Sequence, residues 1–182
     1  MEKTNTQFNR IIEICKNTFQ TKMKDYGPAW RILRPSSITD QIYIKAQRIR
    51  SIETKTEQKI NEGIKSEFTG IINYAIIGLI QLQLGFTEKN TSSNTEIEAL
   101  YNSYAEKALQ LMMDKNHDYD EAWRSMRISS FTDLILMKIF RTKQIEDNNG
   151  NTLISEGIDA NYYDMLNYAV FAMIKLEFEN EC

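Results

Sequence analysis

Residues that could bind an anionic ligand occur twice in this chain at the same spacing. Residues 22–53 align without a gap with residues 115–146, and sixteen of the thirty-two positions are identical. The repeated residues combine arginine and lysine, which bind phosphate or carboxylate, with aromatic rings that can stack on a base. The candidates are Arg31, Arg34, Lys45 and Arg48 in the first copy and Tyr119, Trp123, Arg124, Arg127, Lys138 and Arg141 in the second.

Carboxylates distinguish the second copy from the first. Beyond residue 53 the repeat continues at an offset of 94, and Lys65 and Gly70 are replaced by Asp159 and Asp164. Glu156 and Asp159 then lie one helical turn apart, a spacing that can hold a hard cation together with a carboxylate from another helix. If the chain has a magnesium-dependent site, we expect it to be centred on the second repeat, with the first repeat as a wall that supplies Arg48 or Arg31. The expected ligands are Asp133, Glu156, Asp159 and Asp164.

The same repeated residues also have a structural interpretation. Under it, the charged set containing Asp40, Lys45 and Arg48, with its twin, is a salt-bridge network that fixes helix–helix registry. For that set, the structural and the functional interpretation carry equal weight. For the aromatic pairs, such as Trp30 with Trp123, a role in the core is favoured. Asn73 and its twin lie in apolar helices and are expected to satisfy neighbouring backbone groups.

The elements that must position these residues are helices. Residues 6–25 carry an apolar stripe at helical spacing that Gly27-Pro28 ends. A connector over 28–35 leads to a second helix that runs to about residue 53, and a third helix is expected over 61–84. The second repeat follows the same order, and its last two helices are expected over about 130–146 and 154–178.

The chain is predicted to be all-α, a tandem duplication of a three-helix unit packed as a pseudo-twofold helical bundle. Residues 1–182 form one domain, because each unit alone would have a thin core. Repeat one covers about 6–85, a polar linker about 86–95, and repeat two about 96–178.

Composition narrows the classes of partner. The net charge of −3 does not favour direct nucleic-acid or membrane binding. Two cysteines make no disulfide framework, and the N-terminus shows no signal pattern, so we expect a cytoplasmic protein. The single histidine, His117, has Lys24 as its counterpart, which argues against a repeated histidine-based site. A homo-oligomer is left open.

Three motifs in the second repeat carry a family resemblance. They are K-N-x-D-Y-x-x-A-W at 115–123, D-x-x-x-x-K-x-x-R at 133–141, and E-G-I with D-x-x-N-Y-A within 156–169, and weaker forms occur in the first repeat. Together they resemble the nucleotide modification associated domain, type 1, here in two copies. The resemblance implies a small all-helical protein connected with modified or salvaged nucleotides, without an assigned activity.

A more distant similarity is to the MazG-type all-α nucleoside triphosphate pyrophosphohydrolases. Those enzymes pair an EExxE helix with an ExxD helix around magnesium, and this chain has only the second half, at Glu156 and Asp159. Where EExxE would stand, the helices carry an aspartate followed by lysine and arginine, which suits phosphate binding better than metal-assisted hydrolysis.

Two classes of function follow. The first is a protein that binds a nucleotide, a deoxynucleotide or a modified one, and that could be a divergent magnesium-dependent pyrophosphohydrolase. The alternative is a non-catalytic helical scaffold in which the duplicated polar residues are structural.

Overall fold

The computed structural model confirms the all-α prediction. It describes residues 2–55 and 63–179, and these contain six α-helices, two short 3-10 helices and no strand. The predicted helix start at 61 and the polar turn before it fall partly on 56–62, outside the described residues. The elements are α1 Glu2–Tyr26, η1 Ala29–Ile32, α2 Pro35–Thr54, α3 Ile64–Leu84, α4 Asn94–Tyr119, η2 Ala122–Ser125, α5 Ile128–Asp147 and α6 Ile158–Phe178.

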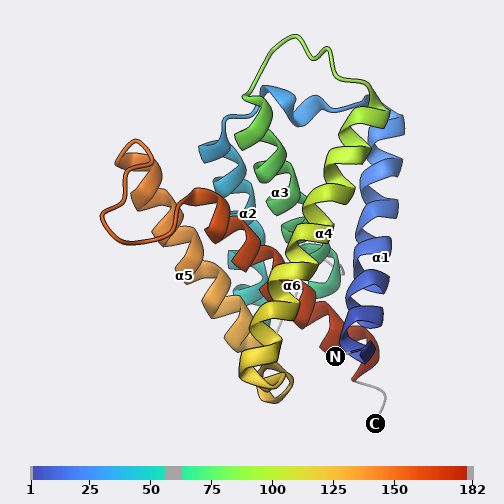
Figure 1. Cartoon of the computed structure of the whole chain (residues 1–182), viewed down its shortest axis with the longest axis vertical. Coiled ribbons are helices and arrows are strands. Elements are labelled where there is room, and N and C mark those ends of the chain that lie inside the picture. The colour runs from blue at the N-terminus through green and yellow to red at the C-terminus, as the bar shows by residue number, and fades with distance from the viewer. Residues whose placement is uncertain (1, 56–62, 180–182) are drawn as a thin grey trace.

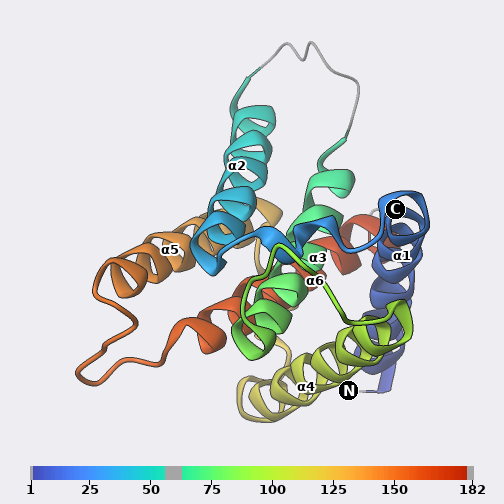
Figure 2. The same cartoon turned by 90° about the horizontal axis from the view of Figure 1, so that it is seen from above.

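The helices form three layers that follow the duplication. The third helices of the two repeats, α3 and α6, pack on each other in the centre (Figures 1 and 2). On one side of them lie α2 and α5, and on the other side α1 and α4. Each first helix packs against the third helices of both repeats, so neither repeat buries its core without the other.

The contact between α2 and α5 is reciprocal, as a pseudo-twofold axis requires. Thr39 at the start of α2 donates a hydrogen bond to Glu146 at the end of α5 (2.7 Å). The equivalent Thr132 on α5 donates to Glu53 on α2 (2.9 Å). Repeated residues of one copy therefore bind repeated residues of the other, which gives this part of the polar set a structural role.

A second reciprocal contact uses the duplicated aspartates. Asp40 on α2 pairs with Lys143 on α5, and Asp133 on α5 pairs with Arg50 on α2, each at 2.6 Å. Lys143 and Arg50 occupy equivalent positions of the two repeats. The structural interpretation thus holds for the aspartates of the repeated charged set.

The predicted helix boundaries agree with the structure to within about four residues, and the largest differences are at the starts of α1 and α6. The later start of α6 has a physical reason. The helix begins at Ile158 rather than at 154, because Gly157 takes the extended conformation of an N-cap and residues 151–157 form a loop. In the first repeat Gly63 caps α3 in the same way. Ser93 and Glu96 form a reciprocal capping box that starts α4, so the linker ends just before it.

The ends of α1 and α4 share a left-handed residue. Gly27 has φ of +66°, and Asp120, its counterpart after α4, has φ of +49°. Glycine adopts this conformation freely, whereas aspartate does so at some cost. In both repeats the turn leads directly into a 3-10 helix that carries the tryptophan.

The central helices are the most apolar. Of the described helices, α3 is long and apolar enough to cross a membrane by length and composition, and most of it is buried within the fold, as in a core helix. Asn73, inside α3, donates to the carbonyl of Cys15 on α1 and accepts from the Tyr101 hydroxyl on α4. The expected structural role of this asparagine is confirmed.

Candidate functional site

A cavity of about 600 Å³ lies in the first repeat, between the end of α1, η1, α2 and α3. This volume is within the range of small-molecule sites, roughly 300–1,000 Å³. Its walls combine aromatic rings with charged and hydroxyl groups. The lining residues used below are Phe19, Lys22, Tyr26, Trp30, Lys45, Glu67, Gly70, Tyr74 and Ile77.

The polar end of the cavity is built by α2 and α3. Glu67, on α3, accepts from Arg48 at 2.6 Å and lies 3.6 Å from Nζ of Lys45. The end of the Lys45 side chain lies over Gly70, where a Cβ would come within 2.6 Å of its Cε. Gly70 therefore leaves room for the lysine, and any larger residue there would displace it.

Lys22 supplies a second cation from α1. It is exposed and has no ion-pair partner among the described residues. The charged lining groups are then two lysines against the single carboxylate of Glu67, which favours an anionic ligand.

Aromatic side chains form another part of the wall. Trp30 lies 6.4 Å from Phe19, between ring centroids, and Lys45 lies 5.8 Å from the centre of the Tyr74 ring. Burial raises the pKa of the Tyr74 phenol, and the nearby Tyr26 adds to the effect. The indole Nε1 atoms of Trp30 and of its counterpart Trp123 are both buried and lack a hydrogen-bond partner within the described chain, so this feature does not distinguish the two copies.

The second repeat has the same two lysines but a different occupant between them. Lys115 and Lys138 are the counterparts of Lys22 and Lys45. Both bind Asp164, the counterpart of Gly70, at 2.8 and 2.6 Å. Burial raises the pKa of the Asp164 carboxyl, but hydrogen bonds and charge from the two lysines outweigh this and leave it below its usual value.

The tryptophan of the second repeat is also covered. Trp123 stacks on Phe171 with ring centroids 4.3 Å apart and planes 9° apart. In the first repeat the position of Phe171 is taken by Ile77, which lines the cavity beside Trp30. The prediction that tryptophan belongs to the core thus fits Trp123, whereas Trp30 is half-buried in a cavity wall.

The connector arginine of the first repeat is engaged within the chain. Arg31 is buried and donates to the side chain of Gln81, to the carbonyl of Gly85 (2.7 Å) and to Asn90 (3.3 Å). The same Gln81 donates back to the carbonyl of Arg31. Arg31 therefore joins η1 to the end of α3 and to the linker, and these contacts are structural.

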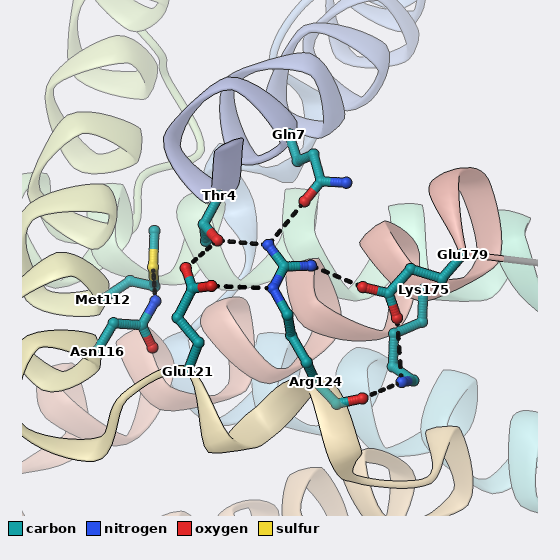
Figure 3. Close-up of polar contacts among 8 residues, drawn as sticks. All are labelled: Thr4, Gln7, Met112, Asn116, Glu121, Arg124, Lys175 and Glu179. Atoms are coloured by element: carbon teal, nitrogen blue, oxygen red, sulfur yellow. Dashed lines mark hydrogen bonds and ion pairs between the residues drawn. The ribbon is translucent and has the colours of Figure 1, made fainter. Parts of the chain in front are cut away.

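Its counterpart Arg124 forms a network at the junction of α1, η2 and α6 (Figure 3). It donates to Glu121 at 3.0 Å and to Glu179 at 2.6 Å, and it also binds Thr4 and Gln7. The network anchors the start of α1, which belongs to repeat one, onto repeat two.

The other predicted contacts to substrate are scattered. Arg34 and Arg127 are exposed at the starts of α2 and α5, and neither lines the cavity. Tyr119 is 71% exposed. Arg141 lies in a separate open groove of about 870 Å³ between α5 and the loop before α6, which Asp133 also lines.

The four predicted magnesium ligands are not brought together. Asp133 pairs with Arg50, and Asp164 is held between two lysines. Asp159 lies near Tyr104 and Tyr163, and Glu156 is exposed near Lys115. In the part of the chain that is described, no group of three or more His, Cys, Asp or Glu side chains is placed to hold a metal ion. The donor set expected for magnesium therefore does not fit a site made by these side chains.

Sequence reasoning missed Lys22, Glu67 and Tyr74. Lys22 and Tyr74 were visible as repeated positions, but nothing in the sequence marked them as neighbours of Lys45. The position equivalent to Glu67 in the second repeat is Asn161, so Glu67 is not one of the residues that the two repeats share. The useful signal was the absence of a side chain at Gly70, which makes room for the end of Lys45 at the cavity wall, rather than the gain of a carboxylate in the other copy.

Comparison with known proteins shows which family the chain belongs to. No curated protein and no solved structure matches the chain. The sequence model of one family, described as nucleotide modification associated domain 1, matches residues 22–82 and again residues 115–176. The two matches begin at the equivalent lysines Lys22 and Lys115 and together span more than half of the chain. The chain therefore belongs to the nucleotide modification associated domain 1 family, as two tandem copies of that domain.

Proposed function

We propose that the protein binds a nucleotide in the cavity of the first repeat. The observation that carries this proposal is a cavity of about 600 Å³ that joins an aromatic wall to two lysines. The family description, which associates the domain with nucleotide modification, supports the same class of ligand.

The two parts of the cavity suit the two parts of a nucleotide. Trp30 and Tyr26 offer ring faces, and stacking of a base on an aromatic side chain contributes about 1–3 kcal/mol. Lys22 and Lys45 offer ammonium groups to phosphate oxygens. Glu67, which also lines the cavity, contacts Arg48 and Lys45 and so restricts the freedom of both cations before a ligand arrives.

Catalysis and magnesium dependence stay predictions. Glu67 is the one carboxylate among the described lining residues, and it already binds Arg48 and Lys45. This arrangement favours nucleotide binding without hydrolysis over the pyrophosphohydrolase activity that the sequence suggested as an alternative. Release of pyrophosphate from a deoxynucleoside triphosphate, measured with and without magnesium, decides that finer question.

The test of binding is a thermal-shift screen of deoxynucleoside mono- and triphosphates with and without magnesium. A ligand at a hundred times its dissociation constant stabilises the protein by about 2.7 kcal/mol. For a chain of this size that corresponds to a rise in Tm of roughly 5–10 °C. A flat response across the panel would refute the proposal and favour the scaffold.

A matched pair of lysines locates the site. Lys22→Ala removes a cation that lines the cavity, and Lys24→Ala removes an exposed lysine of the same helix that does not. Loss of one charge-assisted hydrogen bond, about 1.5–3 kcal/mol, should weaken binding roughly 10–100-fold in Lys22→Ala. Equal affinity in the two variants would place the ligand elsewhere.

A further inference from the structure

We propose that the second repeat is a self-filled copy of the site, in which Asp164 stands where a ligand places its anionic group and Phe171 where it places its ring. The inference rests on the proposed nucleotide site and specifies how the ligand lies in it. The anionic group lies between Lys22 and Lys45, against Gly70, and the planar ring lies on Trp30, beside Ile77.

The anion position follows from the lysines. Family membership and the constant offset make Lys22 and Lys45 equivalent to Lys115 and Lys138. In the second repeat both lysines converge on one carboxylate at hydrogen-bond distance. In the first repeat the carboxylate is missing at that position, Lys45 has only a longer contact to Glu67 at 3.6 Å, and Lys22 is exposed. A ligand anion beside Gly70 would restore the pairing that the second repeat makes internally.

The ring position follows from the tryptophans. Phe171 covers the face of Trp123 in a parallel stack, and it belongs to the same helix as Asp164. In the first repeat the smaller Ile77 and the half-buried Trp30 both line the cavity, and the ring that approaches Trp30 is Phe19, tilted by 40° rather than stacked. At these two positions the first copy lacks a carboxylate and an aromatic ring, although it has Glu67 and Phe19 where the second copy has Asn161 and Met112. A ligand that supplies an anionic group and a ring at positions 70 and 77 has the chemistry of a nucleotide.

The spacing of the two positions gives the ligand a direction. Asp164 and Phe171 are seven residues apart, as are Gly70 and Ile77. On an α-helix this separation is two turns, about 10 Å along the axis on nearly the same face. The ligand should lie along α3, with its anionic group toward the start of the helix and its ring toward the end.

Two substitutions at one position test the anion part. Gly70→Asp would supply the carboxylate that the second repeat carries, and Gly70→Asn would supply the same shape without the charge. Either side chain must move the flexible end of Lys45, so the steric change is matched. Each protein is titrated calorimetrically with the four deoxynucleoside monophosphates, the four triphosphates and inorganic pyrophosphate.

We expect the Asp variant to lose at least about 100-fold in affinity, as for two lost charge-assisted hydrogen bonds, and the Asn variant to lose about tenfold or less. Without ligand, the Asp variant should melt about 2–4 °C above the Asn variant at pH 7, and this difference should shrink as the pH falls below about 3.9, the unfolded value, and through the lower native pKa. Asp164→Gly combined with Phe171→Ile should open the second copy and raise the stoichiometry from one to two ligands per chain.

The outcomes separate the two proposals. Nucleotide binding that is equally strong in wild type and Gly70→Asp would overturn the anion position and leave the proposed function intact. If wild type binds none of the probes, the proposed function fails, and equal melting temperatures of the two Gly70 variants would then overturn the inference as well. A folded Asp164→Gly, Phe171→Ile protein that binds a single ligand would overturn the equivalence of the two copies.

Discussion

Replacement of Asp164 by asparagine should strongly destabilise the protein, because it leaves a buried lysine without a counter-charge. The side chains of Asp164 and Lys138 are 11% and 9% exposed, and their contact is 2.6 Å long. Lys115 also binds the carboxylate but is 59% exposed, so solvent can stabilise its charge. The main cost therefore comes from Lys138.

The expected magnitude follows from this burial. Removing one partner of a buried ion pair costs about 3–5 kcal/mol, and we expect the lower part of that range because the introduced amide could still accept a hydrogen bond. The pKa of Asp164 is lowered in the folded protein, so its contribution is present at neutral pH. That contribution is lost as the pH falls below the unfolded value of about 3.9 and through the native pKa.

The measurement is urea denaturation at pH 7 and near pH 3, with Asp133→Asn as the control. Asp133 also has an ion-pair partner at 2.6 Å, but its side chain is 64% exposed. A surface pair of this kind contributes about 0–1 kcal/mol. A loss below about 1 kcal/mol in Asp164→Asn at pH 7, or a loss that does not shrink in acid, would refute the reasoning.

Three further outcomes are expected. In a Cys182→Ser background, Cys15 should resist alkylation at pH 8 in the native protein and react after unfolding, because burial raises the pKa of its thiol to about 12. Arg124→Met should cost about 2–4 kcal/mol in denaturation, because Glu121 and Glu179 lose their shared cation. Thr39→Val should cost about 1–2 kcal/mol at pH 7 and less near pH 4, because Glu146, whose pKa burial already raises, loses its donor.

Each of these three has a contrary result. Native alkylation of Cys15 at the rate of the unfolded chain would show that its helix opens readily. An Arg124→Met protein as stable as Arg127→Met, which changes an exposed arginine, would show that the network at η2 contributes nothing. The Thr39→Val effect should fall as pH falls, since protonated Glu146 no longer needs a donor for its charge, and a constant effect would contradict that linkage.

The polar residues shared by the two repeats show how much sequence identity between the repeats can reveal about the role of a residue. Identity at a constant offset showed that they matter to both copies, but it did not separate registry from ligand binding. The structure assigns Thr39, Asp40 and Asp133 to reciprocal contacts across the pseudo-twofold axis. Lys45 has the same sequence signature and yet lines a cavity, because α2 turns it toward α1 and α3.

The four predicted magnesium ligands are not brought together in the described residues, for a related reason. Glu156, Asp159 and Asp164 are close in sequence, but the helix begins only at Ile158, so Glu156 stands in the loop before it. Asp164 then points to two lysines that come from α4 and α5. Spacing along one helix could not reveal these cations, since they approach from other elements.

The sequence alone determined the duplication, because identical residues recur at a constant offset. It also determined the helical class and the order of the helices, because these depend on local periodicity, capping and turn residues. It also carried the family motifs, which the match over residues 22–82 and 115–176 confirms. Only the tertiary structure decided which copy is open. A cavity is space left between helices, and whether Gly70 leaves such space depends on Lys45, Trp30 and α1, which the chain brings there only by folding.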